Sequence, residues 1–343
     1  ISCSLVGSEM CIRDSIYIMK KTILCLLCLL WGMAAGAQEN LVRGKRYYEN
    51  RNYAAALPLL QDAAKEGYGE ACYLLGRMYD FGLGVEQNYP IALRMFQRGL
   101  EYGYELGESE LGGLYEWGDG CTADAQKAFD YYQRSHARGV LSGTFNLARC
   151  YYYGKGVAED NEKAFGMLHA LVRNDEFRFD LTGYYRLACR ILGECYHKGF
   201  GTEVNLKEAV RNYFYSKSPD CLYLAARLVH DNRLPAMGYE YSIKNLMDEA
   251  MAGGLDDVQA CYDYAAWASE ANPDWSLAGI GAESRDAVAL FGYLSKAAEA
   301  GYGPAQKLLG DWYSQGRGTP VNRLKAKEWY ARAKANGEQV PEE

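Results

Sequence analysis

A pattern of one tyrosine and two glycines recurs along the chain and constrains its fold more than any other feature. It occurs first as Tyr79-x-x-Gly82-x-Gly84, with a leucine four residues before the tyrosine and an alanine eight residues after the second glycine. Further copies are Tyr115 with Gly118 and Gly120, Tyr151 with Gly154 and Gly156, Tyr196 with Gly199 and Gly201, and Tyr313 with Gly316 and Gly318. The second glycines are 36, 36, 45 and 117 residues apart, and 117 is three times 39. Self-similarity at such a period indicates an array of stacked repeats.

Each repeat predicts two helices joined by the Gly-x-Gly segment. The first, helix A, carries the leucine and the tyrosine, and the second, helix B, carries pairs such as Ala92 and Phe96 that are spaced for one helix face. The alanine suits a point where the two helices cross closely, and the aromatic side chains are expected to fill the space toward the next repeat. A further glycine after each helix B is typical of a left-handed helix end. These glycines are Gly67, Gly103, Gly139, Gly253, Gly301 and Gly337.

The Gly-x-Gly segment itself allows two interpretations. Glycine-rich loops can cradle phosphate groups, but such a loop is needed at a single site and follows a strand. Here the glycine pair occurs five times and follows a predicted helix each time. We therefore interpret all ten glycines as structural turn residues between helices A and B.

These units resemble the Sel-1-like repeat family, a branch of the tetratricopeptide superfamily, because they match its L-G-x-x-Y-x-x-G-x-G-V…A pattern. The resemblance covers most of residues 41–337 and implies an all-α fold, a right-handed α-solenoid of about eight helix-turn-helix repeats. The first unit has the plainer tetratricopeptide spacing, with nine residues from Tyr47 to Ala56. Between Ala209 and Leu309 the pattern fades, and two repeats are expected to be degenerate.

The chain divides into five predicted segments. Residues 1–18 are interpreted as a non-native extension, and residues 19–37 as a signal peptide with Lys20 and Lys21, a short apolar run and a small-residue cleavage site at 35–37. Residues 38–215 are expected to form regular repeats, residues 216–285 degenerate repeats with a longer loop at 270–283, and residues 286–343 a C-terminal repeat and tail. The leader predicts export to the periplasm or the medium, and its apolar run is too short for a stable membrane span.

Composition argues against several function classes. The formal net charge of −7 lacks the basic footprint that nonspecific nucleic-acid binding needs. The four histidines show no His-Glu-x-x-His spacing, no Ser-x-x-Lys or Gly-x-Ser-x-Gly occurs, and no Cys-x-x-Cys pair follows the leader. We therefore expect no catalytic residues, no metal site and no cofactor. The seven cysteines after the leader are interpreted as buried apolar residues, although export would also permit disulfides.

The resemblance implies that helix A lines the concave groove of the solenoid, where a partner would bind. The expected groove residues are Tyr73, Arg77, Asp80 and Phe81 in one repeat, Ser109, Glu116 and Trp117 in the next, Phe145, Arg149, Tyr152 and Tyr153 in the third, and Arg190, Glu194, His197 and Lys198 in the fourth. Arginine and aromatic residues dominate binding hot spots. The alternative is that several of them only pack between hairpins. For Arg77 and Arg149 the groove is favoured, because an unpaired arginine in the core is costly.

The sequence thus predicts an exported, non-catalytic scaffold that binds a peptide or a partner protein. The alternative is a secreted hydrolase acting on β-lactams or cell-wall peptides, an activity attached to some secreted relatives of the family. In a third possibility the array is one module of an envelope complex and docks through its degenerate middle.

Overall fold

The computed structural model describes residues 36–179, 183–232, 234–235, 237–238, 241–271 and 285–341, and within these ranges the only regular secondary structure is helical. The predicted all-α repeat fold is therefore confirmed. The contacts divide the chain into one unit that ends at Met167 and a second that begins at Leu168, and each unit is described by itself. The proposed extension at 1–18 and nearly all of the predicted leader lie outside the described residues, as do positions 272–283 of the predicted long loop.

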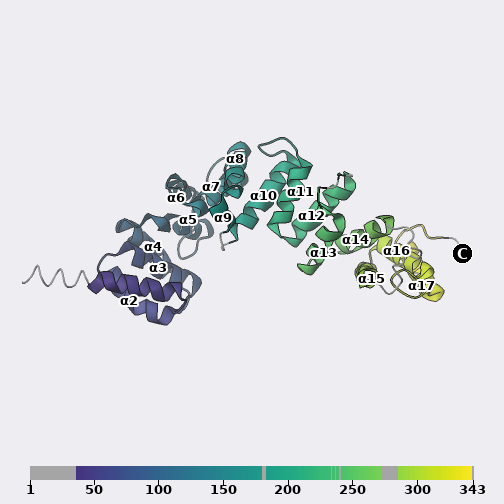
Figure 1. The fold of residues 1–343 in the computed structure, drawn as a ribbon, viewed down its shortest axis with the longest axis horizontal. Coiled ribbons are helices and arrows are strands. Elements are labelled where there is room, and N and C mark those ends of the chain that lie inside the picture. The colour runs from purple at the N-terminus through teal and green to yellow at the C-terminus, as the bar shows by residue number, and fades with distance from the viewer. Residues whose placement is uncertain are drawn as a thin grey trace, which may run out of the picture. The chain divides into compact units, whose positions relative to one another are not determined.

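In the first unit, consecutive helices pack against each other as A–B hairpins (Figure 1). A helix at 36–49 precedes the others. They are α2 (Tyr53–Lys65), α3 (Gly69–Phe81), α4 (Tyr89–Glu101), the 3-10 turn η1 (Glu105–Gly107), α5 (Glu108–Trp117), α6 (Ala125–Ala137), α7 (Leu141–Tyr153) and the start of α8 (Asn161–Val172).

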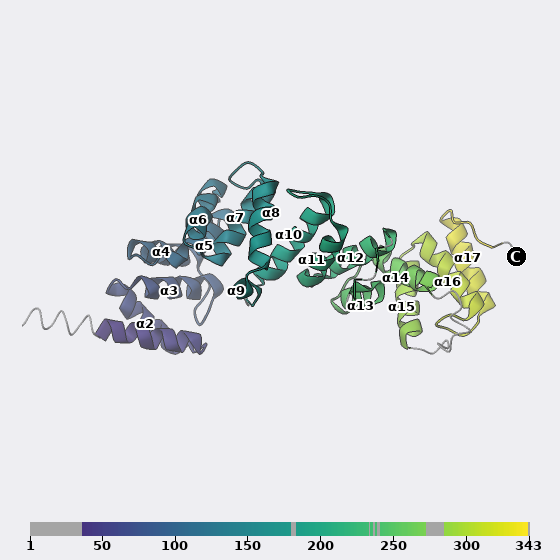
Figure 2. The ribbon, with the colours of Figure 1, turned by 45° about the horizontal axis from the view of Figure 1, so that its top comes forward.

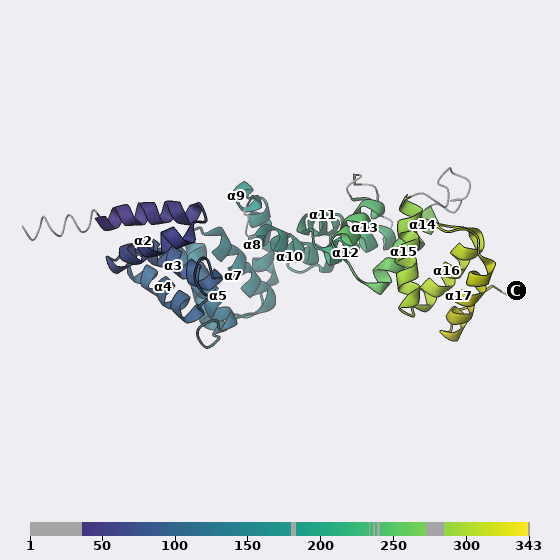
Figure 3. The ribbon, with the colours of Figure 1, turned by 90° about the horizontal axis from the view of Figure 1, so that it is seen from below.

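In the second unit the same pairing continues, and Figure 2 shows α10 to α13 following one another in chain order. The helices are α9 (Asp175–Arg178), α10 (Tyr184–Lys198), α11 (Leu206–Ser216), α12 (Pro219–Asp231), α13 (Ile243–Ala252), α14 (Val258–Ala271), α15 (Arg285–Glu299), α16 (Gly303–Gln315) and α17 (Arg323–Ala335). The last pair, α16 and α17, lies side by side at the yellow end of Figure 3.

The described helices make up eight successive A–B pairs, counting the helix at 36–49 with α2 and α7 with α8. The two degenerate repeats expected from sequence correspond to α12 with α13 and α14 with α15. None of the described helices combines the length and apolar character needed to cross a bilayer.

The glycine of each Leu-Gly pair explains how closely helices A and B approach. A Cβ added at Gly76 would lie 2.6 Å from the ring of Phe96 on α4, and one added at Gly193 would lie 2.6 Å from the ring of Tyr213 on α11. The helix-B ring therefore rests directly on the helix-A backbone. The helix-B alanine one turn earlier is buried at the same crossing, as at Ala92 and Ala209, which are 0% exposed.

The two glycines of each turn do different things. Gly82 ends α3 in the left-handed region at φ 66°, where a residue with a Cβ is strained. Gly84, at φ 70°, lies against the preceding hairpin, and a Cβ there would be 2.5 Å from the Cβ of Tyr53 at the start of α2. The second glycine thus joins one repeat to the helix B of the repeat before it.

A side-chain cap completes each turn, and sequence analysis did not anticipate it. The Asn88 N–H donates to the Tyr79 carbonyl at 2.8 Å, and its side chain accepts from the Ile91 N–H at 3.1 Å to begin α4. This arrangement satisfies one of the free N–H groups at a helix start. The equivalent caps, each four residues after the second glycine, are Asp124, Asp160, Asn205 and Asn322.

One expected helix end is shifted by a residue. Gly253 has φ −76°, whereas Gly254 has the left-handed φ of 89°. Because α13 runs one position further than the pattern indicated, Gly254 follows it as the left-handed residue.

Six of the seven cysteines after position 37 are buried, and Cys121 is half-buried; all seven are thiols. Burial raises the pKa of Cys189 and of Cys195 to about 12. These thiols pack as small apolar groups and are protonated at neutral pH.

Candidate functional site

The predicted groove residues of the first unit divide into covered and exposed positions. Ser109, Phe145 and Tyr152 are buried, at 6%, 0% and 7% exposure. Tyr73, Arg77, Asp80 and Arg149 are half-buried, and the accessible surface of Glu116 is mainly backbone, because its side chain is 4% exposed. Phe81, Trp117 and Tyr153 are 57%, 66% and 52% exposed. The predicted face therefore contains both packing residues and accessible ones.

A hydrogen bond from Tyr73 connects helix A of one repeat to helix A of the next. Its hydroxyl donates to Glu110 Oε1 at 2.9 Å and so joins α3 to α5. Burial raises the pKa of the Glu110 carboxyl, and the bond from Tyr73 partly offsets this. Glu110 was missed from sequence, where its only signal is its place directly before the Leu-Gly pair.

A hydrogen bond also joins α5 to α7 at the repeat positions that Tyr73 and Glu110 occupy. There Asn146 Nδ2 donates to Ser109 Oγ at 3.5 Å, and the two residues are 37 positions apart, as are Tyr73 and Glu110. The face of helix A is thus held to its neighbour by a polar contact at a fixed repeat position.

Arg77 lies on α3, one helical turn after Tyr73. Its guanidinium carbon lies 5.6 Å from the centre of the Phe81 ring, and its buried Nε has no hydrogen-bond partner among the described residues. It interacts electrostatically with Glu110 and with Asp80. Burial, together with the charge of Asp119, raises the pKa of Asp80 to about 6.

Glu116 forms the most connected polar group of this face. Its Oε1 pairs with Arg149 Nη2 at 2.5 Å and with Lys155 Nζ at 2.8 Å, and its Oε2 accepts from the Tyr132 hydroxyl at 2.8 Å. The Glu116 side chain is only 4% exposed. Burial alone would raise its pKa, but the bond from Lys155, the charge of Arg149 and the bond from Tyr132 outweigh burial and lower it.

Arg149 therefore has a partner, and the argument that placed it in the groove does not apply. The cost of an unpaired arginine does not arise, because Glu116 on α5 neutralises it across the contact with α7. Its other nitrogen, Nη1, donates to Asn146 Oδ1 at 3.0 Å. Arg149 contributes to the junction between repeats.

Three exposed rings form what we call the aromatic row: Phe81, Trp117 and Tyr153. They are the last residues of α3, α5 and α7, and each immediately precedes the first glycine of its turn. Lys155 Nζ lies 4.9 Å from the centre of the Trp117 ring, and the Tyr153 ring packs edge-on against Tyr152 at 4.8 Å.

In the second unit the predicted residues lie on α10. Arg190 and Glu194 are one helical turn apart, with 3.7 Å between Arg190 Nε and Glu194 Oε1. His197 Nδ1 lies 3.2 Å from the hydroxyl of Tyr213 on α11. Burial and the charge of Lys198 lower the pKa of His197. His197 thus contacts helix B of its own hairpin.

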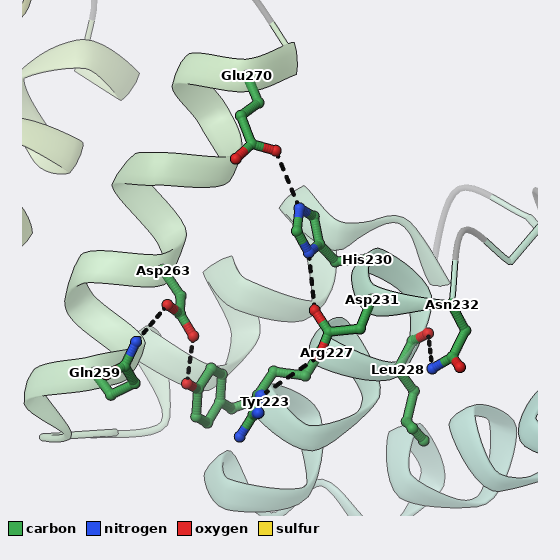
Figure 4. Close-up of polar contacts among 9 residues, drawn as sticks. All are labelled: Tyr223, Arg227, Leu228, His230, Asp231, Asn232, Gln259, Asp263 and Glu270. Carbon is green, nitrogen blue, oxygen red and sulfur yellow. Dashed lines mark hydrogen bonds and ion pairs between the residues drawn. The ribbon is translucent and has the colours of Figure 1, made fainter.

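A further polar group, which sequence analysis missed, joins α12 to α14 (Figure 4). The Tyr223 hydroxyl donates to Asp263 Oδ2 at 2.6 Å, which bridges the two helices as Tyr73 and Glu110 bridge α3 and α5. The Asp263 Oδ1 atom accepts from Gln259 Nε2 at 2.7 Å. Asp263 occupies on α14 the position that Glu110 occupies on α5, although the Tyr-x-x-Gly-x-Gly pattern is absent between Ala209 and Leu309.

His230 provides the second contact between α12 and α14 (Figure 4). Its Nδ1 lies 3.0 Å from Asp231 Oδ1 and its Nε2 lies 3.2 Å from Glu270 Oε2. Its ring stacks on Trp267 with 4.6 Å between centres. Burial would lower the His230 pKa, but the bonds to Asp231 and Glu270 outweigh it and raise the pKa.

Among the described residues, no three histidine, cysteine, aspartate or glutamate side chains are placed to hold a metal ion. His136 Nδ1 lies 2.9 Å from Thr144 Oγ1, but that hydroxyl also bonds the Val140 carbonyl within its own helix. The helix-A face presents aromatic rings, paired charges and hydrogen-bonding groups.

Comparison with known proteins agrees with this architecture. A family model described as Sel1 repeat matches residues 69–103, 104–139, 142–171, 184–214, 258–302 and 303–338. The repeat formed by α12 and α13 and the one formed by the first two helices lie outside these matches. No curated protein matches the sequence.

Two solved structures are similar. A protective antigen present in uropathogenic Escherichia coli strains, displaying an SLR fold, aligns over 90% of this chain with 23% identity and a TM-score of 0.67. The alignment spans 64% of the length of that antigen. A Sel1 repeat protein from Oxalobacter formigenes aligns over 91% of this chain and 87% of its own, with 22% identity and a TM-score of 0.49.

Proposed function

The chain belongs to the Sel1 repeat family, and we propose on that premise that it is a non-catalytic scaffold that binds a peptide or a partner protein on its helix-A face. Sel1 repeats are helical repeats that mediate protein interactions. The observation that carries the proposal is the aromatic row, which combines accessible rings with a backbone held by the bridges between successive helices. A preformed surface lowers the ordering cost of binding.

Export belongs to the same proposal. The predicted leader at 19–37 would direct the chain to the periplasm or the medium, where the partner would also be found. Cell fractionation, followed by mass spectrometry of the N-terminal peptide, tests this. We expect a chain that starts at Gln38 in the exported fraction, and a chain that retains the leader in the cytosolic fraction would contradict it.

Site-specific photo-crosslinking in cells tests the scaffold function. A photoreactive residue is placed at an exposed helix-A position, Arg190 or Arg227, or at an exposed helix-B position, Arg94 or Gln126, as matched control. We expect crosslinks to another protein from the helix-A positions only. Equal crosslinking from both faces, or from helix B alone, would overturn the proposal.

A direct activity assay tests the hydrolase alternative. Purified full-length protein is incubated with a chromogenic β-lactam and with peptidoglycan fragments. We expect no turnover above the buffer blank, and turnover that follows the protein through purification would replace the scaffold by an enzyme.

A further inference from the structure

The aromatic row is not required by the fold. At the same position, the last residue of helix A, the second unit has Lys198 on α10, Asp231 on α12 and Gln315 on α16. These hairpins form with polar residues there. The three consecutive rings of the first unit therefore expose apolar surface that folding does not demand, and such surface typically marks a binding site.

The surroundings of the row carry unpaired negative charge. Asp80 directly precedes Phe81, and Asp119 follows Trp117 by two residues. Among the described residues neither carboxylate forms an ion pair, and Asp119 is close enough to raise the pKa of Asp80. The nearby Glu116 is different, because Arg149 and Lys155 already neutralise it.

Cationic side chains on the protein satisfy only part of this charge. Arg77 stacks on Phe81 and interacts with Asp80 and Glu110, so one guanidinium serves two carboxyl groups on the α3 side. Asp119 is half-buried, and no ion pair to it is formed in the described part of the chain. A positively charged group of a partner would therefore be attracted to the carboxylates that neighbour Phe81 and Trp117 in the chain.

We propose that the aromatic row, together with Asp80 and Asp119, is the docking surface for a partner segment in which an arginine is flanked by apolar or aromatic residues. The proposal rests on the scaffold function above and names the kind of partner. Arginine fits because its planar guanidinium can stack on Trp117 or Phe81 and donate to a carboxylate at the same time. Lysine, a compact and strongly hydrated charge, stacks less well.

The test is a selection from a displayed library of random twelve-residue peptides on the full-length chain. We expect enriched peptides to contain arginine next to aromatic or aliphatic residues. Their affinity, measured by fluorescence polarisation with the labelled peptide, is then compared among variants. Enriched peptides that lack arginine, or the absence of any binding peptide, would overturn the proposal.

Three variants locate the binding. The variant F81Q/W117Q/Y153Q places at each ring the residue that α16 has naturally, and we expect at least tenfold weaker binding with unchanged helicity. The variant D80N/D119N is expected to abolish the preference for arginine over lysine. L324Q, which changes a 71% exposed leucine on α17, is the matched control and should bind as the parent does.

The outcomes separate this inference from the scaffold function. Unchanged binding by F81Q/W117Q/Y153Q would overturn the inference, while helix-A crosslinks in cells would leave the scaffold intact. Sedimentation of the protein with phosphatidylcholine–phosphatidylglycerol vesicles, abolished by the same triple variant, would assign the row to a membrane instead. Loss of a dimer in that variant would assign it to a second copy of the chain.

Discussion

The hairpins of α3 to α6 and the pair of repeats from α12 to α15 solve one packing problem in two ways. In the first region, Gly-x-Gly turns and Asn or Asp caps fix each hairpin, and Tyr73 bridges to Glu110. In the second region the turn glycines are missing between α12 and α13, yet Tyr223 bridges to Asp263 at the corresponding helix positions. The contact between successive A helices is thus retained where the turn pattern is lost.

This difference shows which features the repeat needs. The turn can vary because its role is to reverse the direction of the chain. The stretch after α12, for example, lacks the glycine pair. The side of helix A that meets the next helix A cannot vary as freely, because its polar groups are partly buried and need partners. His230 on α12, which like Glu116 on α5 directly precedes the last residue of its helix, contacts Glu270 on the next helix A at 3.2 Å.

The largest effect is expected from substitutions in the regular turns. In G120A the new Cβ would lie 2.5 Å from the carbonyl carbon of Tyr89, in a residue with φ 74°. Clash and backbone strain together should lower the free energy of unfolding by roughly 2–4 kcal/mol, measured by urea denaturation. The control is G103A, with φ 77° and nothing within 4 Å of the new Cβ, which should lose only about 1 kcal/mol. Equal losses would show that the second glycine does not contact the preceding hairpin.

Next in size is the removal of the charge on Glu116. The variant E116Q keeps the shape but leaves Arg149 and Lys155 without their shared carboxylate, and should cost about 2 kcal/mol. Because the folded pKa of Glu116 is lowered, its contribution is present above the unfolded pKa and is lost as pH falls through the folded one. Unfolding at pH 7 and pH 3 should therefore differ less in E116Q than in the parent. A parallel pH dependence in both proteins would count against this role.

A smaller effect is expected when the hydroxyl of either bridging tyrosine is removed, and the two losses can be compared directly. In Y73F, Glu110 loses its hydrogen bond at Oε1, and its Oε2 has no partner among the described residues, so we expect the free energy of unfolding to fall by about 1.5 kcal/mol. In Y223F, Asp263 keeps its bond from Gln259, and the loss should be about 0.5–1 kcal/mol. Thermal melting of both variants measures the order. A larger loss in Y223F would mean that the degenerate region depends on its bridge more than the regular one does.

The smallest effect is the pH dependence introduced by His230. Its folded pKa is raised above the unfolded value, so its contribution is complete below pH 6.5 and disappears as pH rises through the folded pKa. The variant H230Q should remove roughly 0.5 kcal/mol of this dependence between pH 5.5 and pH 8. H136Q serves as control, because His136 contacts Thr144 and no carboxylate is bonded to it in the described part of the chain. Identical pH profiles for H230Q and the parent would exclude the contribution.

The fold could be predicted from the sequence because the repeat pattern reflects the geometry within each hairpin. Gly82 and Ala92 describe a turn and a crossing within one hairpin, and apolar spacing located α12 to α15 although the Tyr-x-x-Gly-x-Gly pattern is absent there. The site was less accessible. Glu110 and Asp263 act through contacts between helices about 40 residues apart, and only the three-dimensional stacking shows that these positions meet. Arg149 was assigned from the cost of an unpaired charge, and its partner Glu116 could be identified only when α5 and α7 were placed together.

The second glycine of each turn gives the array a direction. Gly84 lies against Tyr53, Gly120 against Tyr89, Gly156 against Ala125 and Gly318 against Ala287, so each of these four turns contacts the hairpin that precedes it in the chain. During synthesis, the helix B against which each of these turns packs is therefore already present when the new hairpin leaves the ribosome. Extra hairpins are accordingly easier to append after the last one than to insert ahead of the first. Deleting the first hairpin removes the surface against which the second one packs.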